Sequence, residues 1–453
     1  MSFPRYPNYK GSGVEWLGEV PAHWEVVPLK HIAEFVNGDA FKPTEWAASG
    51  IPIIRIQNLN GSEDFNYYDG EVEQRYLVHD GDLLFGWSGN RGTSFGPFLW
   101  SRNEVCALNQ HIFRVVPNSV EKRSLFWTLK AVTAHVEDQA HGIIGMVHVT
   151  KGDLGAINVP VPPIPEQTQI AVFLDRETAK IDELVAEQRR LMELLKEKRQ
   201  AVISHAVTKG LNPHAPMKPS GIEWLGDVPA HWEVSAIKRY ADKITDGAHV
   251  SPDTENGVFH FVSTKDVGVD SIDFENCLRT SEQSFDYLVK TGCRPLLGDV
   301  LFSKDGTIGR TVVVREDRDF VVASSLIIIR PTASILDSNF LNCLCQSQSI
   351  TNQVECFVKG AGLPRLSIQN LTKVIGCFPP LDEQKTIAAF LDTELAKFDT
   401  LTTEAQHAID LLQERRTALI SAAVTGQIDV RNAIAAGDEV VGEMLSLKNH
   451  EIF

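Results

Sequence analysis

The sequence predicts two copies of an α/β (α+β) globular domain, joined by two long antiparallel helices that form a coiled-coil-like spacer with pseudo-two-fold internal symmetry. Three observations lead to this fold class. A chain of 453 residues is long enough for several domains. Two of its segments recur later in the chain, and the longer pair carries apolar residues at helical spacing. Hydrophobic residues make up 43% and charged residues 23%, as in ordinary globular proteins.

The duplication sets the order of the elements. Residues 12–30, SGVEWLGEVPAHWEVVPLK, return at 220–238 as SGIEWLGDVPAHWEVSAIK. A second match runs without a gap from 162–208 to 379–425, whereas the segments between the matches diverge. The chain is therefore expected to have five parts, which are a first globule at 1–160, a helix at 161–210, a second globule at 211–377, a second helix at 378–428 and an acidic tail at 429–453.

Each divergent segment has the pattern of a mixed globule. Short runs rich in Val, Ile and Phe, separated by clusters of Gly, Asn, Asp and Pro, predict strands at 51–56, 258–262, 312–314 and 325–329. Helical patterns fall at 123–136 and 338–353.

The repeated segments after the Pro-Pro pairs predict helices of about 40 residues, or roughly 60 Å at 1.5 Å per residue. Their apolar positions share one phase, so the two helices are expected to pack together, antiparallel. The alternative is that each helix packs only on its own globule. The positions expected to pack against the other helix or against a partner are Ile170, Leu174, Ile181, Leu184, Leu191, Leu195, Ile387, Leu391, Phe398, Leu401 and Leu412.

Several classes of function are excluded by missing patterns. The start of the chain lacks a signal peptide and no apolar run is long enough to span a membrane, which predicts a cytoplasmic protein. The seven cysteines contain no C-x-x-C pair, and no triphosphate-binding loop or methyltransferase Asn/Asp-Pro-Pro-Tyr/Phe motif occurs. Pro252-Asp253 followed by Ser263-Thr264-Lys265 lacks the second carboxylate of a nuclease site. We therefore expect no catalytic and no metal-binding residues.

Paired loops in the two globules suit a nucleic-acid surface. The Gly-rich loop FGWSGNRGTSFG at 85–96 corresponds to FSKDGTIGR at 302–310, and RIQNLNG at 55–61 corresponds to STKDVG at 263–268. Cations, amides and hydroxyls in such loops bind phosphates and base edges, although each loop taken alone is also an ordinary polar turn. The net charge of −16 does not exclude DNA, because the acidic residues concentrate in the C-terminal quarter. The DNA-binding candidates are Lys42, Arg55, Gln57, Asn58, Ser88, Asn90, Arg91, His148, Lys151, Thr264, Lys265, Ser303, Lys304, Arg310, Lys359 and Arg365.

The tryptophan pairs Trp16/Trp24 and Trp224/Trp232 have two interpretations. They suit aromatic stacking on bases, or packing where the chain enters each globule. Their strict retention in both halves favours packing.

Three motifs together resemble the specificity subunit of type I restriction-modification enzymes. These are the EWLGEVPAHWE-type opening of each globule, the P-x-x-E-Q start of each helix, and the ISHAVT and ISAAVT endings. The resemblance covers nearly the whole chain, and only the acidic tail has no counterpart in the first half.

The resemblance implies a DNA sequence-recognition subunit without catalytic activity. Each globule would be a target recognition domain that reads one half of an asymmetric, bipartite site in double-stranded DNA. The helices would fix the spacer and dock two modification subunits, which bind S-adenosylmethionine, while restriction subunits would use ATP and Mg²⁺. No cofactor is expected on this chain. The alternatives are a noncatalytic scaffold whose globules bind proteins, and an enzyme with an unfamiliar site.

Overall fold

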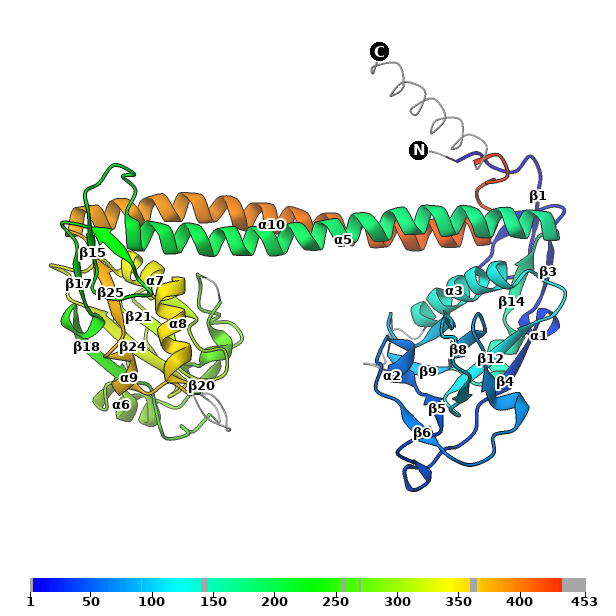
Figure 1. Cartoon of the computed structure of the whole chain (residues 1–453), viewed down its shortest axis with the longest axis horizontal. Coiled ribbons are helices and arrows are strands. Elements are labelled where there is room, and N and C mark those ends of the chain that lie inside the picture. The colour runs from blue at the N-terminus through cyan, green and yellow to red at the C-terminus, as the bar shows by residue number, and fades with distance from the viewer. Residues whose placement is uncertain are drawn as a thin grey trace, which may run out of the picture. The chain divides into compact units, whose positions relative to one another are not determined.

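A computed structural model describes residues 3–90, 92–139, 146–254, 257–268, 270–358 and 365–433. The chain divides into two compact units. Unit 1 combines Met1–Glu187 with His407–Phe453, and unit 2 is Gln188–Gln406. Both divisions fall inside the long helices, so each unit contains one globule and part of each helix (Figure 1).

Unit 1 contains two four-stranded sheets beside one long globule helix. Its elements are β1 (Tyr9–Gly11), β2 (Glu19–Pro21), β3 (Glu25–Pro28), α1 (Leu29–Ile32), β4 (Ala33–Asn37), β5 (Ile51–Ile54), α2 (Ile56–Leu59), β6 (Asn66–Tyr68), β7 (Leu77–Val78), β8 (Leu83–Gly86), β9 (Ser88–Asn90), β10 (Gly96–Leu99), β11 (Cys106–Leu108), β12 (Ile112–Pro117), α3 (Lys122–Gln139), β13 (Met146–His148), α4 (Lys151–Ala156) and β14 (Asn158–Val161).

The first sheet of unit 1 has the order β10-β8-β12-β4 and is antiparallel throughout. The second has the order β6-β5-β11-β7, and its β5–β11 pair is parallel. Phe85 and Phe113 of the first sheet share one buried cluster with Leu125, Leu129 and Val132 of α3. This core holds the sheet against the helix.

Unit 2 repeats the same plan. Its elements are β15 (Met217–Pro219), β16 (Asp227–Pro229), β17 (Glu233–Ala236), β18 (Ala241–Asp246), β19 (Phe259–Val262), β20 (Leu278–Thr280), α6 (Glu282–Lys290), β21 (Val300–Ser303), β22 (Thr311–Val313), β23 (Phe320–Val322), β24 (Leu326–Pro331), α7 (Ser338–Gln346), α8 (Gln348–Phe357), α9 (Ile368–Leu371) and β25 (Ile375–Phe378).

The sheets of unit 2 match those of unit 1 strand for strand at their centres. The order β18-β24-β21-β22 is antiparallel, and β20-β19-β23 contains the parallel pair β19–β23. The predicted duplicated α/β globule is therefore confirmed, although the two sequences diverge. The helix expected at 338–353 is instead two helices, because Ser347 adopts extended backbone between α7 and α8.

The long helices are α5 (Ile164–Lys209) and α10 (Leu381–Val424), and they pack in opposite directions within each unit. In unit 1, Phe173 lies in one core with Ile420, and Asp182 pairs with Arg416 at 2.9 Å. Along these contacts the residue numbers rise in α5 and fall in α10, so the two helices are antiparallel.

Unit 2 contains the equivalent helix pairing. Ile203 and Val207 share a core with Ile387, and Arg199 pairs with Asp399 at 3.6 Å. Arg199 and Arg416 occupy equivalent positions in the repeat, as do Asp182 and Asp399. The same interhelical ion pair therefore forms in both units, which confirms the pseudo-two-fold relation of the helices.

The predicted packing positions divide into three groups. Ile170, Leu174, Ile181, Leu195, Ile387 and Leu391 are buried, and Phe398 and Leu412 are half-buried. Leu184, Leu191 and Leu401 are 44%, 42% and 45% exposed, so they do not pack between the helices, and their packing against a partner stays a prediction. Two helices bury only a narrow stripe on each other, and these three leucines lie outside it.

Polar side chains at equivalent positions of the repeat join each globule to its long helix. In unit 1, the Gln167 Oε1 accepts the Glu121 backbone N–H at 2.8 Å, and its Nε2 donates to the Pro162 carbonyl at 2.8 Å. In unit 2, Gln384 accepts the Asp337 N–H at 2.8 Å and donates to the Pro379 carbonyl at 2.9 Å. The final Gln of the P-x-x-E-Q motif is thus a buried anchor in both units.

The repeated His-Trp dipeptides pack at the same junctions. His23 contacts Glu166 at 2.8 Å in unit 1, and His231 contacts Glu383 at 2.7 Å in unit 2. The following Trp24 and Trp232 are buried, as the packing interpretation predicts. The first tryptophans differ, because Trp16 stacks on His135 with ring centroids 4.8 Å apart, whereas Trp224 is 47% exposed.

The beginning of the predicted acidic tail belongs to unit 1. The Asp429 backbone N–H donates to the Pro4 carbonyl at 2.7 Å, and Val430 is fully buried. Arg431 pairs with Asp429 at 2.6 Å and lies 4.8 Å from the Tyr6 ring. The remainder of the tail, 434–453, lies outside the described residues.

Candidate nucleic-acid interface

The Gly-rich loop of unit 1 forms a surface at the end of β8. After Trp87 the chain continues into β9, which pairs antiparallel with β13 and places Ser88 opposite His148. The Trp87 ring lies 4.8 Å from the His148 ring and 5.5 Å from the His111 ring, and its Nε1 donates to the Gln110 carbonyl at 3.0 Å. Two predicted candidates from distant segments are therefore brought together.

We call this the β9 surface. It consists of Trp87, Ser88, Asn90, Gln110, His111 and His148. Asn90, Gln110, His111 and His148 are exposed. Amide and imidazole groups beside an aromatic ring can contact base edges and phosphates. Gln110 and His111 were not among the candidates, although the two residues before β12 are replaced by Ser324 and Ser325 before the equivalent β24, and this difference within a constant frame was a signal for them.

The 55–61 segment offers fewer side chains for contact with DNA than the sequence suggested. Asn58 is buried, with its Oδ1 accepting the Arg55 backbone N–H at 2.9 Å and its Nδ2 donating to the Ser62 carbonyl at 3.0 Å. Its proposed contact with a base edge is therefore wrong, because both ends of the amide stabilise the turn. Gln57 is exposed, and the Arg55 guanidinium donates to Asn66 Oδ1 at 2.7 Å.

The remaining unit 1 candidates lie elsewhere on the globule. Lys42 is exposed just before the short turn Pro43–Glu45. Lys151 is exposed at the first position of α4, beside a cleft of about 430 Å³ that Lys30 also lines. Arg91 lies outside the described residues.

The equivalent surface of unit 2 is cationic. Asp305 and Arg365 form a β-bridge at the positions that correspond to Ser88 and His148, and their side chains pair at 3.7 Å. Arg310 donates through Nη1 to the Val267 carbonyl at 3.4 Å, which joins the two predicted loops of this unit. Thr264 donates through Oγ1 to the Ser325 carbonyl at 3.1 Å.

We call this the β21 surface. It consists of Thr264, Lys265, Asp305, Arg310 and Arg365. The side chains of Lys265, Arg310 and Arg365 are exposed. Lys359 lies outside the described residues.

Two candidates in the β21 loop are internal. Ser303 is fully buried and accepts the Arg310 backbone N–H at 2.8 Å. Lys304 is 3% exposed and its ammonium forms an ion pair with Asp246, which also bonds the His249 ring at 3.0 Å. The predicted DNA contacts of Ser303 and Lys304 are therefore wrong in this conformation, because both side chains hold the loop from inside.

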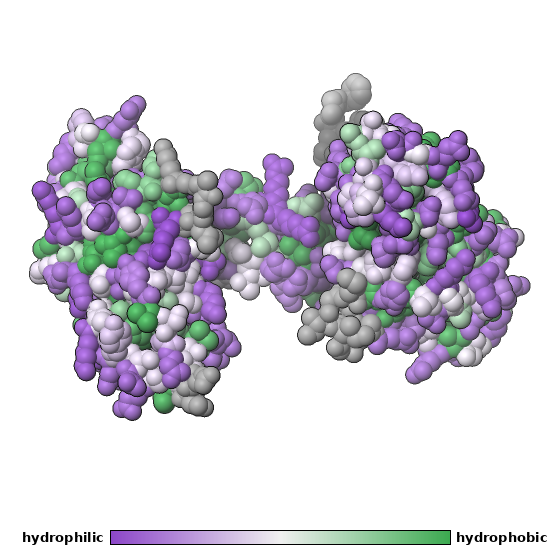
Figure 2. Space-filling view, turned by 90° about the horizontal axis from the view of Figure 1, so that it is seen from below, coloured by the Kyte–Doolittle hydropathy of each residue, from purple (hydrophilic) through white to green (hydrophobic). Residues whose placement is uncertain are grey.

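The described residues contain no cluster of metal-ligand side chains. No group of three or more His, Cys, Asp or Glu side chains in this part of the chain could hold a metal ion. Burial raises the pKa of Cys343, Cys345 and Cys377 to about 12, so these thiols are neutral. None of the described helices has the length and apolar character needed to cross a bilayer. Figure 2 shows that hydrophilic residues cover most of the visible face of each unit, with smaller hydrophobic areas among them.

Comparison with known proteins gives a consistent result. The model of the type I restriction modification DNA specificity domain matches residues 21–192 and again residues 229–410. The EcoBI type I restriction enzyme specificity subunit of Escherichia coli is 24% identical over 432 residues, covering 93% of this chain and 89% of that protein. The MjaVIII specificity subunit of Methanocaldococcus jannaschii is 24% identical over 443 residues, covering 95% and 98%.

A solved structure has the same fold. It comes from work on complex assembly and conformational transition of the type I R-M system, and it aligns with a TM-score of 0.65 at 16% identity, covering 89% of this chain and 98% of the other. The family model matches most of the chain, and it matches two successive parts of it. The chain therefore belongs to the family of type I restriction-modification DNA specificity subunits.

Proposed function

We propose that this chain reads an asymmetric, bipartite DNA site, with each globule recognising one half. The observation that carries the proposal is the contrast between the two equivalent surfaces. The β9 surface presents amides, imidazoles and an indole, whereas the β21 surface presents two arginines and a lysine. One scaffold with two different sets of side chains is suited to two different half-sites.

The chemistry of the two surfaces suggests their contacts. Asn90 and Gln110 carry amides that can bond adenine in the major groove, and Arg310 and Arg365 carry guanidinium groups that can bond guanine or phosphate. Phosphate contacts would supply affinity and base contacts would supply sequence preference.

The exposed leucines of the long helices support docking of modification subunits. Leu184 and Leu411 are 44% and 50% exposed in unit 1, and the equivalent Leu401 and Leu194 are 45% and 51% exposed in unit 2. Apolar side chains exposed at matching positions in both units suit two copies of one partner. In this proposal the chain is noncatalytic. The modification subunits bind S-adenosylmethionine, and the restriction subunits use ATP and Mg²⁺.

Salt-dependent binding to random-sequence duplexes tests DNA recognition. We expect the full chain with its modification subunit to lose affinity as salt rises, and Arg310→Ala, Arg365→Ala and Lys265→Ala to lower affinity further. A residue that contacts a phosphate should also reduce the slope of log K against log salt by about 1. Lys290→Ala, at an exposed position at the end of α6, is the matched control.

The competing interpretation, a scaffold that binds only proteins, predicts no such salt dependence. Wild-type affinity in all three variants would remove the β21 surface from the interface. Absence of duplex binding by the complex would contradict the proposed function itself.

A further inference from the structure

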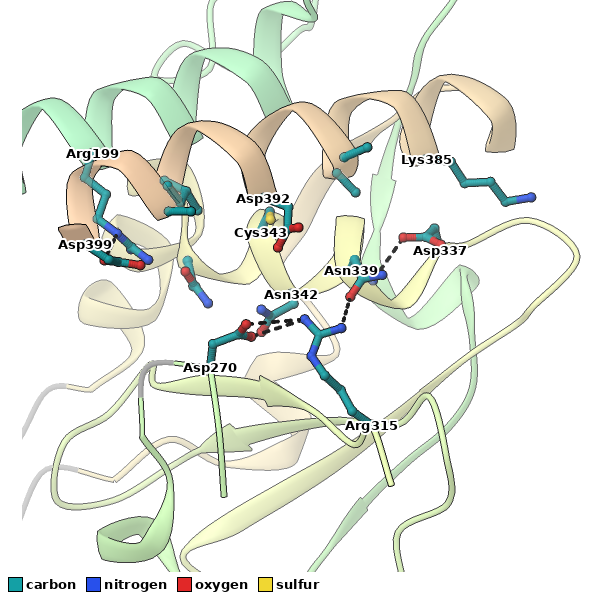
Figure 3. A pocket seen from close by; sticks show the side chains of 15 residues that line it. Arg199, Asp270, Arg315, Asp337, Asn339, Asn342, Cys343, Lys385, Asp392 and Asp399 are labelled. Carbon is teal, nitrogen blue, oxygen red and sulfur yellow. Dashed lines mark hydrogen bonds and ion pairs between the residues drawn. The ribbon is translucent and has the colours of Figure 1, made fainter. Parts of the chain in front are cut away.

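A cleft of about 420 Å³ lies in unit 2 between α7, α10 and the segment that carries Arg315 (Figure 3). Asn342 lies in its wall and is only 6% exposed, yet its buried Oδ1 has no hydrogen-bond partner. Asp392 reaches the same cleft from α10, and no described residue forms an ion pair or hydrogen bond with its carboxylate. The cleft thus contains two acceptors without a protein donor, which are the buried Asn342 Oδ1 and the exposed Asp392 carboxylate.

Unit 1 shows which side chains occupy the equivalent position of the repeat. Gln167 and Gln384 hold Glu121 and Asp337 by the same hydrogen bond, so α3 and α7 can be aligned residue by residue from these two anchored positions. In that alignment Arg123 corresponds to Asn339, and Trp127 to Cys343. Asp175 corresponds to Asp392, because each lies the same number of residues after the anchoring glutamine of its long helix.

In unit 1 the aspartate is fully paired. The Arg123 Nε donates to both carboxylate oxygens of Asp175 at 2.8 Å, and the Trp127 Nε1 donates to Oδ1 at 2.8 Å. Unit 2 retains the aspartate as Asp392, but both donors have been replaced, by an amide and by a thiol. Burial raises the pKa of the Cys343 thiol to about 12, so Cys343 adds no charge to the cleft.

Two of the three cations that line the cleft already pair with aspartates other than Asp392. Arg315 bonds Asp270 at 3.3 Å and Asn339 at 3.1 Å. Arg199 pairs with Asp399 at 3.6 Å. Lys385 points away from the other labelled side chains (Figure 3).

We propose that this cleft binds the guanidinium group of an arginine carried by another polypeptide. The incoming guanidinium takes the place that Arg123 fills in unit 1, donating to the Asp392 carboxylate and to the Asn342 Oδ1. The cleft follows α10 from Ala388 to Asp399, about 16 Å at 1.5 Å per residue, which suits a chain segment rather than a single amino acid. The inference does not depend on DNA recognition.

Titration of the full chain with N-acetyl-L-arginine amide, followed by calorimetry, tests the site. We expect saturable binding to the wild type and at least about a tenfold weaker Kd for Asp392→Asn, which removes the charge of the acceptor. Asp175→Asn in unit 1 is the matched control and should leave the Kd unchanged. The corresponding lysine amide should bind more weakly, because it lacks the planar pair of donors.

A second variant fills the cleft from within. Asn339→Arg restores the residue type that unit 1 has, so its guanidinium should pair with Asp392 and abolish binding of the arginine amide. Absence of saturable binding to the wild type, or equal binding to the wild type and Asn339→Arg, would overturn the proposal. Tighter binding of free arginine than of the blocked amide would contradict a polypeptide as the source.

Discussion

At the scale of single residues, buried charges decide how the β21 loop is held. Lys304 is 3% exposed and its partner Asp246 is 19% exposed, so removal of the ammonium leaves a largely buried carboxylate whose remaining side-chain contact is the His249 ring at 3.0 Å. Loss of one partner of a buried pair costs about 3 kcal/mol. We therefore expect Lys304→Ala to lower the free energy of unfolding by that amount in denaturant titrations. The exposed Lys265→Ala should change it by less than about 0.5 kcal/mol, and an equal effect of both variants would contradict the buried pair.

A half-buried cation, Lys130, predicts that stability depends on pH. Burial, together with the nearby Arg416 guanidinium, lowers the pKa of Lys130 from 10.5 to about 8, and its ammonium lies 5.5 Å from the Phe98 and Phe126 rings. Between these two pKa values the unfolded chain holds a proton that the folded chain has released. The free energy of unfolding contributed by this residue should therefore rise with pH from about 8 to 10.5 and be lowest below pH 8.

Substitution of Lys130 separates this effect from other groups. Lys130→Met should raise the free energy of unfolding at pH 7, by on the order of 1–3 kcal/mol, and should remove the rise at alkaline pH. The exposed Lys151→Met is the control. A pH profile of Lys130→Met that parallels the wild type would show that Lys130 is not the titrating group.

At the scale of secondary-structure elements, one glutamine attaches each globule helix to its long helix. Gln384 accepts the Asp337 N–H and donates to the Ile335 and Pro379 carbonyls at 2.8–2.9 Å, and it is fully buried. Its loss leaves buried backbone groups unpaired, each at a cost of about 1–3 kcal/mol. We expect Gln384→Leu to lower the free energy of unfolding by about 3 kcal/mol or more. The same change at the exposed Gln413 should be nearly neutral, and a neutral Gln384→Leu would exclude the anchoring role.

The elements also show where prediction from sequence succeeds and where it stops. The long helices and the duplicated globules follow from local periodicity and from the repeat, and both are present in the structure. The exposed side of the helix pair could not be inferred, because the heptad-like pattern includes Leu184 and Leu401 although two helices cannot cover them. Recognition of that exposed side required the structure.

For the candidate DNA-binding surfaces, the sequence predicted which loops take part but not which of their side chains are exposed or lie together. The β9–β13 pairing of Ser88 with His148 depends on two distant segments, and so does the burial of Lys304 against Asp246. A cation in a Gly-rich loop has the same local sequence whether it points outward or inward. Arg310 and Lys265 are exposed and Lys304 is not, and this difference depends on the sheet order β18-β24-β21, which the local sequence does not specify.

At the scale of the whole molecule, the long helices should set the distance between half-sites. Four residues inserted after Glu187 add about 6 Å and just over one turn, so the apolar stripe stays nearly in phase. At about 3.4 Å per base pair this corresponds to one or two additional base pairs in the spacer, with both half-sites unchanged. Two inserted residues turn the stripe by about 200° and should detach the helices and the modification subunits.

Methylome sequencing of cells that express each insertion variant with its modification partner measures this spacer. An active four-residue variant with an unaltered spacer would show that the helices do not set half-site separation.

The central claim, that each globule reads one half of the site independently, is tested most directly by exchange of a globule. Residues 1–160 would be replaced by the corresponding globule of a relative, and the methylated sequence would be read in cells that contain the modification subunit. We expect one half of the bipartite site to change, while the other half and the spacer remain as in the wild type. A simultaneous change in both halves would contradict independent recognition by the two globules.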